Sequence, residues 1–314
     1  MRPLGIIFMV TFCYVGSPAL AVITCTASMT NVTFGSVNVL TGAAVDTTAT
    51  ETITCSGATA STSYVFCTDL AAGADVSGNQ RRMASGANRL NFDLYKDSAR
   101  TQEWGNYTNN FLGGGSQNTF TSNASGNISA TITLYARLAG NQQTAPPGAY
   151  SETMTSGTSQ RLRYGATSGT CPVGGSTTGF SFTVSATVLT SCSVTATNLN
   201  FGSAGVLASN VDATNTVTPQ CTNGTPYNIG LDAGTGTGAT VAARKMSNGP
   251  ATITYSLYSN STRTTVWGNT IGTNTVSGTG TGNTQALTVY GRVPPQTTPA
   301  PNTYTDTIVV TVTY

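Results

Sequence analysis

Histidine is absent from the 314-residue chain, and only 8% of the residues carry a charge. Without histidine the protein lacks the commonest general base and the commonest metal ligand. The 11 carboxylates are scattered along the chain, and no zinc-binding or EF-hand spacing occurs. We therefore expect a protein that is not an enzyme and that holds no metal and no cofactor.

Long runs of basic or apolar residues are absent as well. The formal net charge is +2, without a cluster of lysine and arginine, which argues against nucleic acid as a partner. The apolar run Leu4–Val15 is too short to span a bilayer, and it stands between Arg2 and the small-residue sequence Ala19-Leu20-Ala21. This order predicts a signal peptide at residues 1–21 and an exported chain without a membrane span.

Threonine, serine, asparagine and valine are abundant in the remaining sequence, together with most of the 35 glycines. Short runs of alternating apolar and polar residues recur between turn signals, as in Thr48–Cys55, Leu90–Tyr95 and Ile128–Leu138. A period of two is typical of β-strands that have one face in a core. The spacing of these runs predicts an all-β fold of antiparallel sandwiches, and the chain is long enough for two domains.

The sequence that begins at Cys25 is repeated from Cys192 onward. Several short motifs recur in the same order in both copies. The matched segments are Val32-Thr33-Phe34-Gly35-Ser36 with Leu199-Asn200-Phe201-Gly202-Ser203, Arg81-Arg82-Met83 with Arg244-Lys245-Met246, Trp104-Gly105-Asn106 with Trp267-Gly268-Asn269, and Tyr135-Ala136-Arg137 with Tyr290-Gly291-Arg292. One fold has therefore been duplicated, and the first copy carries insertions.

Six cysteines follow the predicted signal peptide, which allows 15 disulfide connectivities in an exported chain. Cys25 and Cys55 occupy the same places in the first copy as Cys192 and Cys221 in the second. The repeat thus predicts the pairs Cys25–Cys55 and Cys192–Cys221, and it leaves Cys67–Cys171 as a third pair found only in the first copy. A reactive thiol pair is the alternative, but little charge lies nearby to stabilise a thiolate.

The two copies differ at their C-terminal ends. The first copy continues into an alternating strand at residues 180–188, whereas the second ends on the strand Thr305–Tyr314. The apolar positions of the extra strand are Phe180, Phe182, Val184, Ala186 and Val188. If the fold needs this strand, the second copy lacks its last strand and exposes an apolar groove that an incoming strand could fill.

The terminal strand of the second copy should border this groove. The residues that we expect there are Ile308, Val310, Val312 and Tyr314, or the alternating set of opposite parity. Alternation alone does not decide between the two faces.

The duplicated Cys…Phe-Gly-Ser…Cys unit, the Trp-Gly-Asn segment and the terminal Val-Thr-Val-Thr-Tyr strand resemble the spore coat protein U domain family. That family includes subunits of archaic, Csu-type chaperone–usher pili. The resemblance implies immunoglobulin-like sandwiches that lack their last strand, which a periplasmic chaperone supplies first and the N-terminal extension of the next subunit supplies later. It also implies an outer-membrane usher as a partner.

In this interpretation residues 22–188 form an N-terminal adhesin domain that strand 180–188 completes in cis, and residues 189–314 form a pilin domain that accepts a donor strand. After removal of the predicted signal peptide, only Val22-Ile23-Thr24 would precede Cys25. Three residues extend about 10 Å, which is too short for a donor strand. The resemblance therefore predicts a tip adhesin at the surface of a Gram-negative bacterium, which attaches to an abiotic or host surface and supports biofilm formation.

The inserted loops of the first copy are candidates for the contact surface. Loops 105–127 and 155–179 should lie at the distal end of the molecule. Their apolar residues are Phe111, Leu112, Leu162, Tyr164 and Val173. Exposed together, they would form a hydrophobic contact patch; the alternative is that they pack under their own loops. A lectin-like tip and a capping role in a spore or cell coat are the rival functions.

Overall fold

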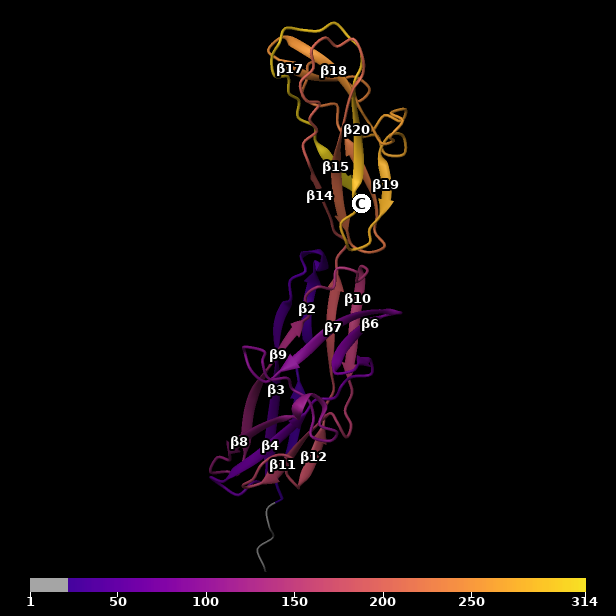
Figure 1. Cartoon of the computed structure of the whole chain (residues 1–314). Coiled ribbons are helices and arrows are strands. Elements are labelled where there is room, and N and C mark those ends of the chain that lie inside the picture. Colours follow the sequence, from indigo (N-terminus) through magenta and orange to yellow (C-terminus); the bar gives the residue numbers. More distant parts are fainter. Residues whose placement is uncertain (1–21) are drawn as a thin grey trace, which may run out of the picture.

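The structure is a computed structural model that describes residues 22–314. The predicted signal peptide at residues 1–21 lies outside the described residues. Apart from the short 3-10 helices η1 (Val39–Thr41) and η2 (Phe111–Gly113), the regular elements are all β-strands, as predicted. Figure 1 shows two immunoglobulin-like β-sandwiches placed end to end, with the first in indigo to pink and the second in orange to yellow.

The first sandwich consists of two sheets with the orders β1-β3-β9-β7-β6-β10-β13-β2 and β12-β11-β4-β8, and β5 pairs with β6. The strands of the larger sheet are β1 (Thr24–Met29), β2 (Val32–Val37), β3 (Val45–Ser56), β5 (Val76–Ser77), β6 (Gln80–Ser85), β7 (Asn88–Tyr95), β9 (Ile128–Leu138), β10 (Gly148–Met154) and β13 (Phe182–Val188). The strands of the smaller sheet are β4 (Ser63–Asp69), β8 (Ser116–Thr121), β11 (Arg161–Ala166) and β12 (Ser176–Gly179).

The second sandwich has the sheet orders β14-β15-β20-β18-β17 and β19-β16-β21. Its strands are β14 (Cys192–Ala196), β15 (Val211–Cys221), β16 (Pro226–Leu231), β17 (Arg244–Asn248), β18 (Ala251–Tyr258), β19 (Val276–Thr279), β20 (Leu287–Val293) and β21 (Val310–Thr313). The strand β21 pairs with β16 as β11 pairs with β4 in the first sandwich. Among the described residues, no strand of the second sandwich corresponds to β12 or β13.

The strand β13 completes the first sandwich. It pairs antiparallel with β10 along its whole length and parallel with β2 on its other side. Phe182, Val184, Ala186 and Val188 are each at most 5% exposed and face the core, and Phe180, just before the strand, is buried too. The side chains that the alternation predicts to be buried are therefore the ones that face the core.

The duplication extends to matching registers and disulfides. Cys25 lies opposite Cys55, and Cys192 lies opposite Cys221. The structure contains the three disulfides that the repeat predicts, Cys25–Cys55, Cys67–Cys171 and Cys192–Cys221. Only three residues, 189–191, join β13 to β14. At this junction the Asn223 side chain donates a hydrogen bond to the backbone oxygen of Thr144, 2.9 Å away.

A buried arginine occupies the same place in both cores. Arg81 and Arg244 are fully buried, and each donates from Nη2 to the backbone oxygen of the neighbouring tryptophan, Trp104 or Trp267, at 2.8 and 2.7 Å. Each also donates from Nε to a second carbonyl. Burial lowers the pKa of Arg81 to about 10, so it stays charged at neutral pH. Carbonyl oxygens therefore accept hydrogen bonds from a buried cation at the centre of each sandwich, through Nε and Nη2 of Arg81 and through all three guanidinium nitrogens of Arg244.

Replacement of Arg81 by methionine should strongly destabilise the first domain. Arg81→Met leaves the carbonyls of Ala71 and Trp104 buried without a donor, and each such loss costs roughly 1–3 kcal/mol. We expect a loss of about 3 kcal/mol in the free energy of unfolding, measured by urea denaturation of the mature chain. The neighbouring Arg82 is more exposed and pairs with Asp75, so Arg82→Met should cost at most about 1 kcal/mol. Equal losses in both variants would contradict this account.

Candidate functional site

An open groove lies in the second sandwich where β13 lies in the first. Residues 199–203 correspond to β2. Residues 302–306 correspond to β10, because Thr305 bridges Ser247 of β17 as Ser151 pairs with Ala84 of β6. Neither segment forms a strand in the second sandwich. The segment 302–306 makes only an isolated bridge, Ser247 with Thr305. A groove of about 770 Å³ separates the two segments. The groove thus has the position and the two flanking segments of a missing strand.

The floor of this groove is apolar and incompletely covered. Leu199, Phe201, Met246 and Ile253 line it, and each is only partly buried. Their counterparts under β13 are Val32, Phe34, Met83 and Leu90, none of them more than 7% exposed. Met83 faces Leu90 across β6 and β7 as Met246 faces Ile253 across β17 and β18, so the comparison is position by position. The difference in burial reflects the strand that covers one floor and not the other.

The residues predicted to border the groove lie along its continuation. Ile308, Val310 and Val312 are partly buried against the second core, and Tyr314 is 57% exposed. None of these four residues lines the 770 Å³ groove, which is bordered by the preceding residues 298–304. The strand β21 is nevertheless the outer strand of its sheet, whereas its counterpart β11 is covered by β12. The repeat aligns Leu199 and Phe201 with Val32 and Phe34 of the first copy, but it predicted no role for them in the groove.

The apolar residues expected on the distal loops do not form an exposed patch. Leu112, Leu162, Tyr164 and Val173 are at most 9% exposed, and Phe111 is half-buried. Leu162 and Tyr164 point from β11 into the core, where the Tyr164 hydroxyl accepts a hydrogen bond from the backbone N–H of Cys25. The Phe111 ring lies 5.0 Å from the guanidinium of Arg81. The prediction of an exposed hydrophobic contact surface is therefore wrong for Leu112, Leu162, Tyr164 and Val173.

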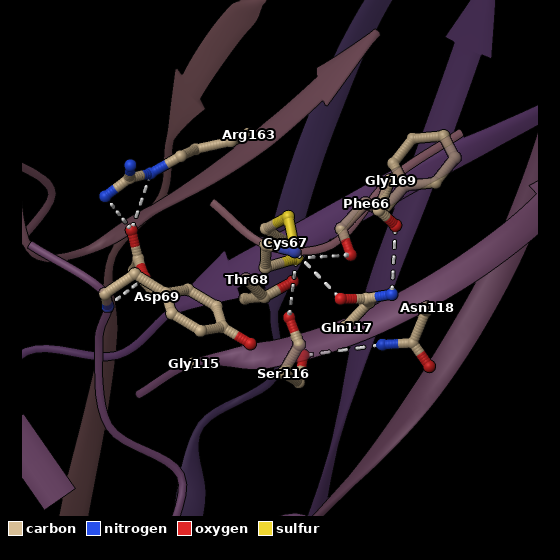
Figure 2. The surroundings of a disulfide bond; sticks show 12 residues. Phe66, Cys67, Thr68, Asp69, Gly115, Ser116, Gln117, Asn118, Arg163 and Gly169 are labelled. Atoms are coloured by element: carbon tan, nitrogen blue, oxygen red, sulfur yellow. Dashed lines mark hydrogen bonds and ion pairs between the residues drawn. A yellow bond between two sulfur atoms is a disulfide. The ribbon is translucent and has the colours of Figure 1, made fainter. Parts of the chain in front are cut away.

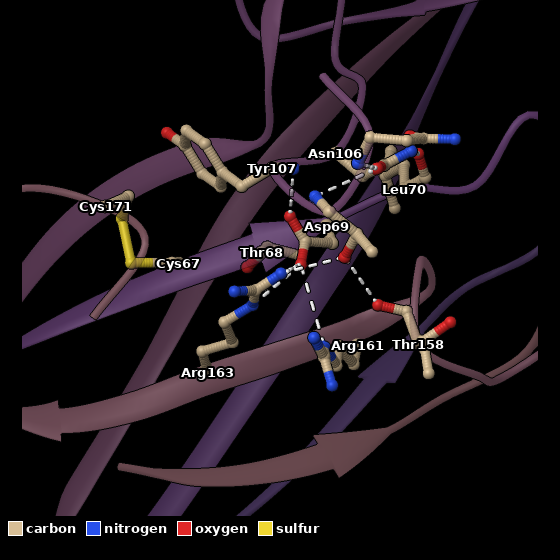
Figure 3. A network of polar contacts seen from close by, with 12 residues as sticks. Cys67, Thr68, Asp69, Leu70, Asn106, Tyr107, Thr158, Arg161, Arg163 and Cys171 are labelled. Carbon is tan, nitrogen blue, oxygen red and sulfur yellow. Dashed lines mark hydrogen bonds and ion pairs between the residues drawn. A yellow bond between two sulfur atoms is a disulfide. The ribbon is translucent and has the colours of Figure 1, made fainter. Parts of the chain in front are cut away.

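A buried carboxylate explains why the inserted loop 105–115 folds back. Asp69, fully buried at the end of β4, accepts a hydrogen bond from Arg163 Nε at 3.0 Å and one from the backbone N–H of Tyr107 at 2.8 Å. Figure 3 shows Arg161 and Arg163 reaching this carboxylate from β11. Charge-assisted bonds of this kind are stronger than neutral ones. In the second domain Gly230 stands in the place of Asp69, and the shorter loop packs directly over it.

The third disulfide holds the other inserted loop in a similar way. Cys171 joins Cys67 in β4, and its backbone N–H donates to the side-chain oxygen of Gln117 at 2.8 Å (Figure 2). Val173 packs beside Val65 and Cys67 in a small cluster of buried residues. The predicted contact residue Val173 is therefore part of the anchor that fastens the β11–β12 loop to the sheet.

The end of the molecule farthest from the second domain exposes small, uncharged residues. The loops 57–62 and 122–127 are joined by backbone hydrogen bonds, such as that from the Ala58 N–H to the Gly126 oxygen at 3.0 Å. Loop 167–175 follows β11 toward the same end (Figure 1). The exposed residues of the three loops are glycine, alanine, serine, threonine, asparagine and proline. This surface can offer hydroxyl and amide groups to a ligand, but no charge.

The sequence model of the Spore Coat Protein U domain matches residues 11–157 and 178–311. The chain belongs to this family. It is 39% identical over 87 residues to Protein U of Myxococcus xanthus, an alignment that includes 27% of this chain. The chain spans about half of that relative, 48% of its length.

The solved structures that are similar to the chain include two that contain pilus tip subunits. A chain in the crystal structure of the CsuC–CsuE chaperone–tip adhesion subunit pre-assembly complex from archaic Csu pili of Acinetobacter baumannii is 18% identical, with a TM-score of 0.53; 93% of this chain and 100% of that chain are covered. The CupB6 tip adhesin of Pseudomonas aeruginosa is 11% identical, with a TM-score of 0.36 and coverage of 92% and 93%. The first of these shows that the two share a fold.

Among the described residues of this Spore Coat Protein U chain, no group of histidine, cysteine, aspartate and glutamate is placed to hold a metal ion. Within residues 22–314, no helix is long and apolar enough to cross a membrane.

A further difference between the two copies of the Spore Coat Protein U fold is a buried pair of residues. Glu51 in β3 is fully buried and accepts a hydrogen bond from the Thr68 hydroxyl of β4 at 2.9 Å. The equivalent residues of the second copy are Val217 and Ile229, an apolar pair in the core. Burial raises the pKa of Glu51 to about 7. The position of Glu51 within the alternating run Thr48–Cys55, on the same face as Ile53, is a signal that could have revealed this residue.

The first domain should lose stability as the pH rises from about 4.5 to 7. In this range the folded state binds a proton on Glu51 that the unfolded state releases, so unfolding becomes easier with rising pH. Relative to Glu51→Gln, the wild-type free energy of unfolding should fall by roughly 3 kcal/mol between pH 4 and pH 8. Urea denaturation at several pH values, followed by Trp104 fluorescence in a Trp267→Phe background, measures this difference.

Thr68→Val provides the matched control, because it removes a hydrogen bond that lowers the pKa of Glu51. This variant should show a steeper loss of stability with pH than the wild type. Parallel pH profiles for the wild type and Glu51→Gln would contradict the assignment.

Proposed function

We propose that this chain is the tip adhesin of a chaperone–usher pilus. Its first domain, residues 22–188, attaches the pilus to a surface and supports biofilm formation. Its second domain, residues 189–314, accepts a β-strand from the adjacent subunit. The partners are a periplasmic chaperone, an outer-membrane usher and that adjacent subunit, and the chain is exported through the periplasm to the tip at the cell surface of a Gram-negative bacterium.

The observation that supports this proposal is the difference in burial between equivalent apolar residues under β13 and in the groove of the second domain. Val32 and Met83 are fully buried under β13, whereas Leu199 and Met246 are only partly buried at the same places in the second domain. Full burial of a side chain of this size contributes roughly 1.5–3 kcal/mol, so an incoming strand has a large apolar driving force. Neither flanking segment, 199–203 or 302–306, lies in a strand, and their one strand-like pairing is the Ser247–Thr305 bridge, so an incoming strand can pair with the side that this bridge does not use.

The predicted role of the C-terminal strand remains part of this proposal. A donor that follows the path of β12 and β13 would pair first with the outer edge of β21 and then enter the groove. In the first domain the equivalent path runs along β11 and then between β10 and β2. Val312 and Tyr314 correspond to Leu162 and Tyr164, which are buried. Strand addition at β21 would therefore cover side chains that are now partly or largely exposed.

The similarity to a chain of a chaperone–tip adhesion subunit complex supports the choice of partners. That complex comes from Csu pili, and this chain shares the fold of its matched chain. Both halves of this chain match the Spore Coat Protein U domain. A first domain that contains its own completing strand leaves one open groove in the described residues, which suits a subunit joined to the fibre at one end.

A donor peptide should stabilise the second domain. The peptide with the sequence of residues 176–191 carries the alternating pattern that fills the first domain. At 100 times its dissociation constant a ligand adds about 2.7 kcal/mol to stability, which should raise the Tm of the second domain by about 5–10 °C. Calorimetry of the mature chain measures this shift. The same peptide with Val184→Asp serves as the control, because it places a charge in the apolar groove.

Hydrogen exchange locates the bound peptide. Residues 199–203 and 302–306 should gain protection with the unmodified peptide and not with the Val184→Asp peptide. If both peptides leave the Tm and the exchange of these segments unchanged, the groove is not a strand acceptor.

Because the predicted apolar residues are buried, the proposed surface for attachment is the group of polar distal loops. Their exposed hydroxyl and amide groups favour hydrogen bonding with a neutral polar surface or glycan, which makes a lectin-like tip the second candidate. The polar loops that carry this observation are 57–62, 122–127 and 167–175.

Charges placed on these loops should abolish attachment. The triple variant Ser61→Arg, Ser125→Arg and Ser168→Arg should reduce binding of the mature chain to beads coated with hydroxyl groups at least tenfold. The matched control, Thr262→Arg on the second domain, should bind like the wild type. Competition by free sugars would identify a lectin, while inhibition by none of them would favour general surface attachment. Unchanged binding by the folded triple variant would place the contact elsewhere.

A further inference from the structure

The segment 172–191 is held by a disulfide at each of its ends. Cys171 is bonded to Cys67 in β4 of the first domain, and Cys192 is bonded to Cys221 in β15 of the second. Between these two bonds lie β12, β13 and the three residues that join the domains. The covalent connection between the two cores therefore runs from β4 through this segment to β15.

The first of these anchors, the Cys67–Cys171 disulfide, is attached to a buried inner strand. Cys67 is fully buried, and β4 lies between β11 and β8, hydrogen-bonded on both sides. Beside Cys171, the Gln117 side chain accepts from one backbone N–H of the loop and donates to the oxygen of Gly169 (Figure 2). The anchor therefore reaches an inner strand of the sheet, not its edge. The second copy has no counterpart to this disulfide.

The segment between the anchors is held only by non-covalent contacts. The strand β12 pairs with β11, and β13 pairs with β10 and β2. The apolar side chains of β13 add burial, but no covalent bond. Under tension between the two domains these contacts must yield before either disulfide does, because covalent bonds are far stronger.

We propose that segment 172–191 is a strap that limits how far the first domain can be pulled apart. When tension detaches β13, the chain extends only until it is taut between Cys171 and Cys192. A fully extended segment of this length spans at most about 7 nm, so the gain in length is smaller than that. Tension then passes through the Cys67–Cys171 bond into β4, and the 104-residue stretch that this bond closes is bypassed.

The strap also favours re-insertion of β13 after the tension falls. The detached strand stays tethered at both ends close to its empty site, so its effective concentration there remains high and it can insert again. This inference rests on the proposed function, because a pilus tip is the part of the fibre on which tension acts. The strap itself depends only on connectivity and can be measured without any adhesion.

Single-molecule stretching of the mature chain, residues 22–314 with handles at both termini, tests the strap. The wild type should show a short, reversible lengthening of less than about 7 nm before the rest of the first domain opens. In the variant Cys67→Ala/Cys171→Ala, the opening of the first domain should release about 36 nm more chain, since 104 residues are no longer bypassed. Wild-type opening in one event, without the short step, would overturn the proposal.

A second variant keeps the test decisive if the cysteine variant does not fold. Ser185→Pro removes a backbone donor in the middle of β13 while leaving all three disulfides in place. It should lower the force of the short step and leave its length unchanged. A short step of unchanged force would show that β13 is not the released strand. Failure of the donor peptide to bind the second domain would count against the proposed function alone.

Discussion

The burial of β13 between β10 and β2 is the contact on which the behaviour of both domains depends. In the first domain this one strand covers Val32, Phe34 and Met83 and leaves the core closed. The second domain has the same frame, with the same registers and the same central arginine, but the described chain provides no strand for that place. A closed and an open form of one fold thus exist side by side in a single molecule.

Much of this architecture could be predicted from the sequence, because antiparallel pairing preserves the spacing of repeated motifs. The matching distances from Cys25 to Cys55 and from Cys192 to Cys221 predicted two disulfides and the start of each domain. Alternation in residues 180–188 predicted which side chains of β13 are buried. Both features depend on local periodicity and on counting along the chain, which a sequence displays directly.

The loops and the groove depended on contacts that no local pattern displays. Leu112 is apolar and stands among glycines, yet it turns inward with a φ of 52°, held in a loop that Asp69 fastens from another strand. Likewise, the floor of the groove is built from segments near residues 200, 246 and 253, which only the fold brings together. The sequence matched several of these residues between the copies, but their shared exposure required the arrangement of the sheets.

The exchange of Asp69 for Gly230 has a consequence for engineering. The loop 105–115 is held in place through a carboxylate on one strand and arginines on another, so its conformation is not a property of its own residues alone. Transplanted into the second domain by itself, it would meet a glycine and find no charge to bind. Such a loop can be moved to a new scaffold only together with Asp69 and Arg163. A design that copies the contiguous loop sequence alone will lack the ion pair and hydrogen bond that maintain its conformation.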